Sequence, residues 1–163
     1  MAKGKNKKDQ NHSPRIVNRR ARRDYEVLDS FEVGIVLRGS EVKSIREGRV
    51  QISEAFAKVD SNRMELHLFN MEVSAYSHSH GANGHDKLAV RKLLAHRRQI
   101  KRLEVQCEDR GVTLIPLTLY FNDRGICKIE LGVCKGKKTH DKRDTIKEKQ
   151  IDRDIKRLMS KRV

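Results

Sequence analysis

Two adjacent runs of strand-forming residues constrain the fold of this chain most strongly. The first covers residues 113–121 (TLIPLTLYF) and the second covers residues 126–134 (ICKIELGVC). The turn-forming segment NDRG at 122–125 separates them, so the pair predicts an antiparallel hairpin of two long strands. Pro116 cannot donate a ladder hydrogen bond and therefore predicts a strand edge or a bulge within the first run.

The preceding part of the chain predicts more strands. In residues 31–38 (FEVGIVLR), apolar residues alternate with Glu32, Gly34, Val36 and Arg38, which is typical of a half-buried strand. Gly39 is expected to end it. Three other strands are expected at residues 50–52, 55–59 and 64–69, the last two joined by a turn at 60–63. In the run 64–69 the inward residues are expected to be Met64, Leu66 and Leu68.

Helices are expected at three places. Asn18 can cap a short helix that carries arginines at 19, 20, 22 and 23 on all sides, which indicates a basic arm rather than a core element. Ser40 can cap a second short helix over 41–47, stopped by Gly48. A substantial helix with one apolar face is predicted over 87–103.

About six short strands and one substantial helix indicate a mainly β fold with some α structure. Open strand edges are a hazard, so a small closed barrel is favoured, with an open α+β sandwich as the alternative. The length of 163 residues fits one domain. We expect a basic, disordered N-terminus at 1–14, a barrel domain at 15–134 and a basic tail at 135–163, because the two ends have little to bury.

The net charge of +15 is concentrated at the two ends. Residues 1–23 hold nine bases and one acid, residues 135–163 hold twelve bases and five acids, and residues 24–134 hold sixteen of each. Within the neutral middle, residues 87–103 contain seven bases and no acid. These three basic segments predict a polyanion as partner, most plausibly a shaped, folded RNA contacted through its backbone.

Other classes of protein fit poorly. No apolar run is long enough for a membrane span, and the basic N-terminus lacks the apolar region of a secretory signal. Cys107, Cys127 and Cys134 form no CxxC pair, which favours reduced thiols in the cytoplasm. Cys127 shares a strand face with Ile129, Leu131 and Val133, and Cys134 lies on the other face, so buried packing roles are expected for most of them.

The histidines His78, His80 and His85 form the most metal-like cluster, but further ligands are missing, so we expect no metal and no cofactor. No nucleophile motif, phosphate-binding loop or carboxylate pair indicates catalysis, and no catalytic residue is expected. A metal-dependent RNA-processing enzyme that uses these histidines stays as a weak alternative. A structural rRNA-binding protein of the ribosomal type is a stronger one, since it shares the charge pattern.

Five segments together resemble one known family. In chain order they are 18–27 (NRRARRDYEV), 31–50 (FEVGIVLRGSEVKSIREGRV), 91–100 (RKLLAHRRQI), 111–121 (GVTLIPLTLYF) and 132–144 (GVCKGKKTHDKRD). They look like the SsrA-binding protein family, SmpB. The resemblance implies an oligonucleotide-binding-like barrel that binds the tRNA-like domain of transfer-messenger RNA and delivers it to stalled ribosomes. It also implies a tail that is disordered when free and helical in the decoding centre and empty mRNA channel of the small subunit.

The resemblance also implies site residues. The expected RNA-binding positions are Asn18, Arg19, Glu32, Lys43, Arg91, Lys92, Leu94 and His96. The expected decoding-centre and tail positions are Gly136, Lys137, Lys138, His140, Asp141, Lys142, Arg143, Leu158 and Met159. Transfer-messenger RNA and the ribosome are thus the expected partners of a monomeric cytoplasmic adaptor that needs no membrane.

Overall fold

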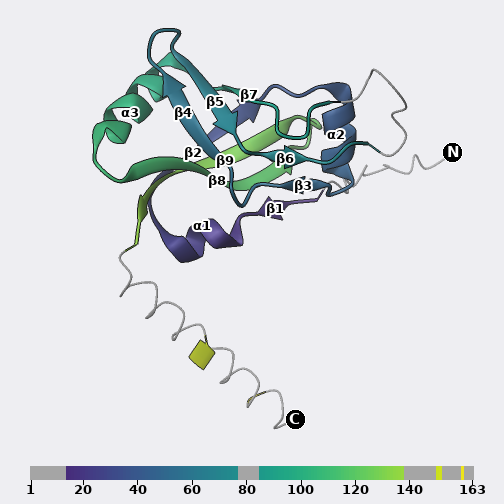
Figure 1. Ribbon diagram of the computed structural model, residues 1–163, viewed down its shortest axis with the longest axis horizontal. Coiled ribbons are helices and arrows are strands. Elements are labelled where there is room, and N and C mark those ends of the chain that lie inside the picture. The colour runs from purple at the N-terminus through teal and green to yellow at the C-terminus, as the bar shows by residue number, and fades with distance from the viewer. Residues whose placement is uncertain (1–13, 77–84, 138–149, 152–158, 160–163) are drawn as a thin grey trace, which may run out of the picture.

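The computed structural model describes residues 14–76, 85–137, 150, 151 and 159 (Figure 1). Its strands are β1 Ile16–Val17, β2 Tyr25–Ile35, β3 Val50–Gln51, β4 Phe56–Asp60, β5 Glu65–Phe69, β6 Glu72–Val73, β7 Arg91–Leu94, β8 Val112–Phe121 and β9 Cys127–Gly136. Its helices are α1 Arg19–Asp24, α2 Gly39–Arg46 and α3 Arg97–Glu108. The chain is therefore mainly β with a few helices, as the sequence predicts.

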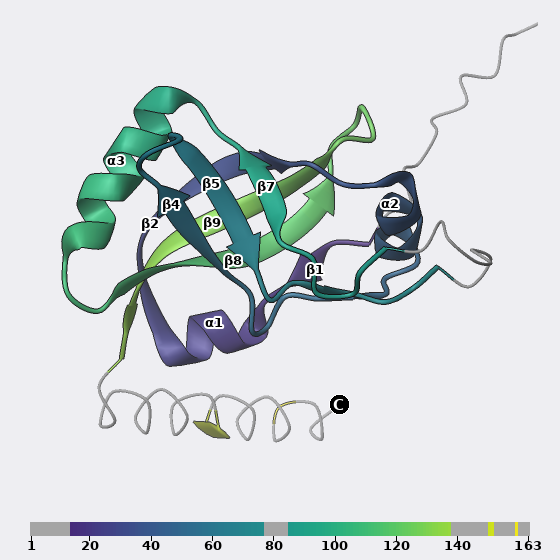
Figure 2. The same cartoon turned by 45° about the horizontal axis from the view of Figure 1, so that its top comes forward.

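The main sheet is antiparallel and its pairings return on themselves. The strand order is β1-β8-β4-β5-β7-β2-β9, and β9 also pairs with β8, so six strands form a ring (Figure 2). The expected long hairpin is β8–β9, and its register shifts between Pro116 and Thr118, which confirms the predicted bulge. Between β4 and β8 the ring is joined by a single register pair, Ala57 with Leu114.

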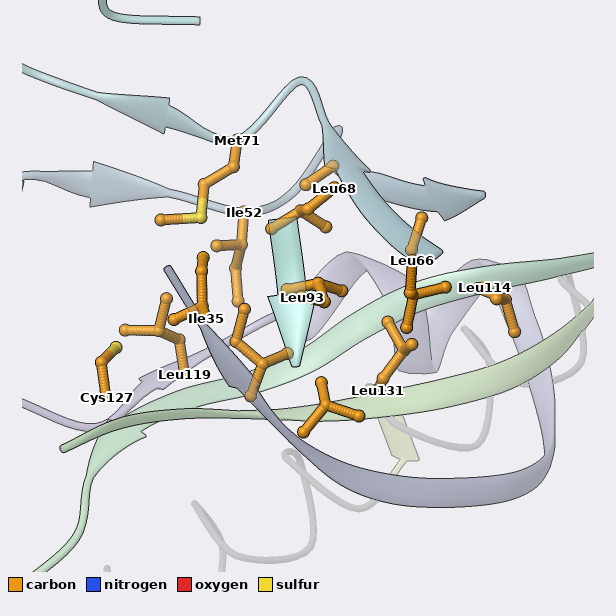
Figure 3. Packing of buried hydrophobic residues seen from close by; sticks show 14 of the residues in the cluster. Ile35, Ile52, Leu66, Leu68, Met71, Leu93, Leu114, Leu119, Cys127 and Leu131 are labelled. Carbon is orange, nitrogen blue, oxygen red and sulfur yellow. The ribbon is translucent and has the colours of Figure 1, made fainter. Parts of the chain in front are cut away.

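Apolar side chains fill the inside of the ring (Figure 3). Leu66, Leu68, Ile129 and Leu131 are fully buried there, and Cys127 joins them on the same face. The other face of β8 and β9 contributes a second, smaller cluster of Ala21, Ile115, Leu117 and Cys134. The two faces of β9 therefore carry the residues that period-two alternation predicts.

The predicted helix over 87–103 is wrong in its first half. Residues Arg91–Leu94 form β7, which pairs with β5 and β2, and α3 begins only at Arg97. In β7 the side chains of Arg91 and Leu93 are buried while those of Lys92 and Leu94 are exposed, which is a period of two. The short run RKLL fits the period of a helix as well as that of a strand. It forms a strand because it pairs with two neighbouring strands.

The two shorter helices also differ from expectation. Arg38, not Ser40, is the N-cap of α2, and its N–H donates to the Glu41 carboxylate at 2.7 Å. The expected stop at Gly48 is confirmed by its φ of 75°, where glycine costs least. Helix α1 is not a free arm, because Ala21 is only 2% exposed and packs on the smaller cluster.

Asn18 explains how α1 is fixed to the ring. Its Oδ1 accepts a hydrogen bond from the Ala21 N–H at 2.9 Å, which confirms the predicted cap. Its Nδ2 donates to the carbonyls of Ile52 and Pro116, each at 3.0 Å. One buried amide thus joins the helix, the segment after β3 and the bulged strand β8. Among the described residues, no helix has the length and apolar character needed to cross a membrane.

Candidate nucleic-acid interface

A row of four residues crosses the outer surface of four neighbouring strands. Gly34 on β2 pairs with Leu94 on β7 and with Lys128 on β9, and Lys128 pairs in turn with Tyr120 on β8. Leu94 is 53% exposed although it is apolar. Gly34 has no side chain, and the Leu94 side chain lies close over its backbone. The row therefore mixes an apolar contact, a bare backbone and a cation on one face.

Beside this row lies a cavity of about 410 Å³, here called the Leu94 hollow. Its lining residues are Gly34, Ile35, Leu94, Asn122, Asp123, Arg124, Ile126 and Lys128. Ile126 is 51% exposed, so two large apolar side chains reach the surface here. The hollow combines the apolar side chains of Ile35, Leu94 and Ile126 with four polar ones, which suits a flat ligand group such as an unstacked base.

Glu32 lies two residues before Gly34 on the same face of β2 and is held by two donors. The Tyr120 hydroxyl donates to Oε2, and Lys128 Nζ approaches Oε1 at 3.3 Å. The hydrogen bond from Tyr120 and then that from Lys128 lower the pKa of Glu32 below its ordinary value. The same bond to Glu32 raises the pKa of Tyr120 to about 12, so the phenol stays a donor at neutral pH.

Helix α3 follows β7 in the chain and carries positive charge. Its first half carries the exposed bases Arg97, Arg98, Lys101 and Arg102. Arg102 pairs with Asp29 on β2 at 2.8 Å and lies 5.3 Å over the Phe31 ring, which ties the helix to the strand that carries Glu32. In the part of the chain that the structure describes, Arg97, Arg98 and Lys101 form no ion pair. They are therefore available to phosphates.

Four of the residues expected to bind RNA are exposed along this face. Glu32, Lys92, Leu94 and His96 all lie on β2, β7 or the start of α3. Lys92 is paired with Glu65 on β5, and the His96 N–H donates to Gln99 Oε1 at 2.9 Å. The structure thus brings Glu32 and His96, which are 64 positions apart in the sequence, onto one face.

Two other residues expected to contact RNA are buried in the structure. Asn18 is 1% exposed and Arg91 is 3% exposed, and both use their polar atoms inside the protein. The Arg91 guanidinium donates to Glu41 at 2.8 Å and to the carbonyls of Met71 and Ala89 at 2.6 and 2.9 Å. Arg19 on α1 and Lys43 on α2 are exposed, but these helices lie on other sides of the ring (Figures 1 and 2).

The expected tail positions are described only in part. Gly136 ends β9 opposite Tyr25, and the Lys137 N–H donates to the Asp24 carbonyl at 3.1 Å. Met159 has helical backbone and is 69% exposed. The remaining expected positions, Lys138, His140, Asp141, Lys142, Arg143 and Leu158, lie outside the described residues.

The histidines considered as metal ligands are likewise only partly described. His78 and His80 lie outside the described residues. His85 has its Nδ1 3.0 Å from Ser40 Oγ and its Nε2 3.1 Å from the Val73 carbonyl, so it links α2 to β6. Among the described residues, no group of three or more His, Cys, Asp or Glu side chains could hold a metal ion.

Sequence reasoning missed Gly34, Tyr120 and Lys128. Alternation along residues 126–134 places Lys128 on the face opposite Cys127 and Ile129, so an outward charged residue could have been recognised. Tyr120 lies at the end of an apolar run and gives no such signal. Its meeting with Glu32 depends on strand order, which no local pattern encodes.

Comparison with known proteins identifies the family of this chain. The family model described as "SmpB protein" matches residues 15–161. The SsrA-binding protein of Caulobacter vibrioides is 48% identical over 90% of this chain and 94% of its own length, and that of Coprothermobacter proteolyticus is 46% identical over 86% and 92%. A solved structure described as "tmRNA-SmpB: a journey to the center of the bacterial ribosome" contains a chain 44% identical to this one, with a TM-score of 0.65 over 78% of this chain and 87% of that chain. The chain therefore belongs to the SmpB family of SsrA-binding proteins.

Proposed function

We propose that this chain binds the tRNA-like domain of transfer-messenger RNA and delivers it to ribosomes stalled without a codon in the decoding site. Membership of the SmpB family supports this function, as does the similarity to a chain from a tmRNA–SmpB structure. The same membership makes the chain an RNA-binding protein rather than an enzyme. It would act as a monomer in the cytoplasm.

The observation that carries the proposal is the outer face of β7 and β2 together with α3. This surface contains the exposed side chain of Leu94 and the Glu32 carboxylate, which is hydrogen-bonded to Tyr120. It also contains the first half of α3, which has four basic residues and no acidic one. We interpret the six-strand ring as an oligonucleotide-binding-like barrel whose outer surface, rather than its core, receives the RNA. Such a face suits a folded RNA with some unstacked bases.

Each part of the face has its own chemical task in this proposal. Arg97, Arg98 and Lys101 bind phosphates, which gives affinity without sequence preference and a strong dependence on salt. Leu94 and the Leu94 hollow receive the apolar face of a nucleotide. Glu32 cannot pair with phosphate, so it accepts hydrogen bonds from a base edge.

The tail has a separate task. We propose that the basic tail, residues 135–163, reaches into the decoding centre and the empty mRNA channel, where it is helical and replaces codon–anticodon pairing. The expected contacts are the basic residues after Gly136 and the apolar pair Leu158 and Met159. Lys137 is fixed by its bond to Asp24, so the tail leaves the protein from one defined point. Translation then resumes on the tag-coding frame of the transfer-messenger RNA.

A truncation separates the two tasks. Deleting residues 144–163 should abolish tagging on stalled ribosomes and leave affinity for the tRNA-like domain nearly unchanged. The matched variant R97E/R98E, with the tail intact, should lose RNA affinity first. Loss of RNA binding in the truncated protein would contradict this division. Retention of the protein at one copy per subunit after a high-salt wash would instead favour a structural rRNA-binding protein.

A further inference from the structure

The Glu32 carboxylate occupies a position that is unfavourable by itself. Directly opposite it on β9 lies Glu130, and two like charges at paired positions repel each other. The Glu32 side chain is also 55% exposed, so water alone would leave it free to change rotamer. Its observed position therefore needs partners that hold it.

Those partners come from two different strands. Lys128 is a diagonal neighbour on β9, and Tyr120 lies one strand farther away on β8. The phenol therefore reaches across β9 to bind Oε2, while the ammonium group takes Oε1. Arg15, 5.7 Å from the Tyr120 ring centre, covers the ring. Each carboxylate oxygen of Glu32 thus has a partner that holds it in the protein without RNA.

We propose that Tyr120 is a positioning residue that, together with Lys128, holds Glu32 as a preformed acceptor for the Watson–Crick edge of an unpaired guanine. The inference rests on the proposed RNA-binding function. A preformed acceptor loses less conformational freedom on binding than a mobile one, so affinity rises without a new contact. The lowered pKa of Glu32, caused first by the Tyr120 bond, keeps the acceptor ionised in mildly acidic solution.

The choice of guanine follows from the donors and acceptors left over. A carboxylate has about four acceptor sites, of which Tyr120 and Lys128 use one on each oxygen. Each oxygen of Glu32 keeps one site, and two parallel acceptors match two parallel N–H donors. Guanine offers these at N1 and N2. Adenine and cytosine place a ring acceptor beside their amino group, and uracil has a single N–H between two carbonyls, so all three fit worse.

Affinity for the in vitro transcribed tRNA-like domain tests the role of Tyr120. Tyr120→Phe keeps the ring and loses only the hydroxyl, and it should raise Kd about tenfold at pH 7. In an E32Q background the same change should have little further effect, because Tyr120 acts through Glu32. Tyr25→Phe is the matched control, since the Tyr25 hydroxyl has no hydrogen-bond partner within the described part of the chain. Thermal unfolding checks that all variants fold.

A pH series separates positioning from a merely structural role. Between pH 7 and pH 4.5 the Kd of Tyr120→Phe should rise by about a further twofold, because the pKa of Glu32 returns towards its ordinary value. The wild type and Tyr25→Phe should not show this rise. Equal Kd values and equal pH profiles for the wild type and Tyr120→Phe would overturn the inference, as would equal losses in the E32Q background. Failure of the wild type to bind this RNA would refute the proposed function itself.

Single inosine substitutions test the base. Inosine keeps N1–H and lacks the exocyclic amine of guanine. We expect one unpaired guanosine of the tRNA-like domain at which inosine weakens binding to the wild type about fivefold to tenfold and has no effect on E32Q. If no such position couples to Glu32, guanine is not the base that it accepts.

Discussion

The Nε atom of Arg91 lies 2.8 Å from a Glu41 carboxylate oxygen, and the two side chains are only 2% and 4% exposed. The other carboxylate oxygen accepts from the Arg38 N–H, and the guanidinium also reaches the carbonyls of Met71 and Ala89. One buried ion pair thus joins the start of α2 to the first residue of β7. It fixes β7 so that Leu94 points outward on the proposed RNA face.

Removing one partner of this pair should be costly. In Arg91→Met, Glu41 is left as a buried charge without its main partner, and two carbonyls lose their donor. We expect the free energy of unfolding to fall by about 3–5 kcal/mol, measured by urea denaturation with circular dichroism. Arg97→Met, on the exposed side of α3, should change it by less than about 0.5 kcal/mol. Similar values for the two variants would show that the buried pair adds no stability.

Arg91 also shows what a single sequence cannot reveal. The apolar pattern over 87–103 predicts a helix that includes residues 91–94, and the family resemblance implies that Arg91 contacts RNA. The run is too short to distinguish two periodicities, and the acid that neutralises Arg91 lies 50 positions away. Long-range pairing, not local propensity, decides both the strand and the burial. The same holds for Asn18, whose cap was predicted although its contacts to Ile52 and Pro116 were not.

Features with a strong local signal were predicted well. The β8–β9 hairpin, the bulge near Pro116 and the faces of Cys127 and Cys134 follow from turn residues, a missing N–H and period-two alternation. Exposed candidates for RNA binding, Glu32 and Leu94, came from the family resemblance. The donors that hold Glu32 could not be predicted, because Tyr120 meets it only after three strands have taken their places in the ring.

Gly34 should be needed for the shape of the proposed RNA face. A Cβ at this position would lie 3.2 Å from the Leu94 Cβ, which is closer than normal contact. We expect Gly34→Ala to displace Leu94, to fill part of the Leu94 hollow and to raise Kd for the tRNA-like domain about threefold to tenfold. A filter-binding titration measures this change.

Gly39→Ala is the matched control for Gly34→Ala. A Cβ there meets nothing within 4 Å, and the position begins α2. This variant should bind RNA like the wild type and gain about 0.4–1 kcal/mol of stability, because alanine restricts the unfolded chain. Unchanged RNA affinity in Gly34→Ala would show that the spacing between β2 and β7 is unimportant for binding.

The three thiols should differ in reactivity. Burial raises the pKa of Cys127 to about 12 and that of Cys134 to about 11, so both stay protonated at pH 8. Cys107 is partly exposed, and burial raises its pKa as well. Because the thiolate is the reactive form, iodoacetamide at pH 8 should label Cys107 first in the native protein. All three should react at similar rates in urea.

The same pKa values predict a loss of stability in alkali. Burial keeps these two thiols protonated in the folded protein, whereas in the unfolded chain they ionise at their ordinary pKa. Their contribution to stability is therefore complete below the pKa of the thiol in the unfolded chain, and it is lost as pH rises towards the pKa of the thiol in the folded protein. For Cys127 and Cys134 this window runs from about pH 8.5 upward. Cys127→Ala/Cys134→Ala should therefore show a weaker fall in Tm above pH 9 than the wild type. If the plots of Tm against pH were parallel for the two proteins, the two thiols would not contribute to the loss of stability in alkali.

The distance between the RNA face and the start of the tail should matter for rescue. Lys128 and Gly136 lie eight residues apart on β9, which corresponds to about 27 Å of extended strand. Gly136 is paired with Tyr25, and Lys137 is held by Asp24, so this spacing is rigid.

Inserting Gly-Ser-Gly-Ser between Lys137 and Lys138 adds up to about 13 Å of flexible chain. We expect RNA affinity to stay unchanged and the tagging of a stalled translation product in vitro to fall at least tenfold, because the tail no longer starts from a fixed point. The same insertion between residues 5 and 6 should leave both unchanged. Full tagging by the first variant would show that the rigid attachment to Asp24 and Tyr25 does not guide the tail.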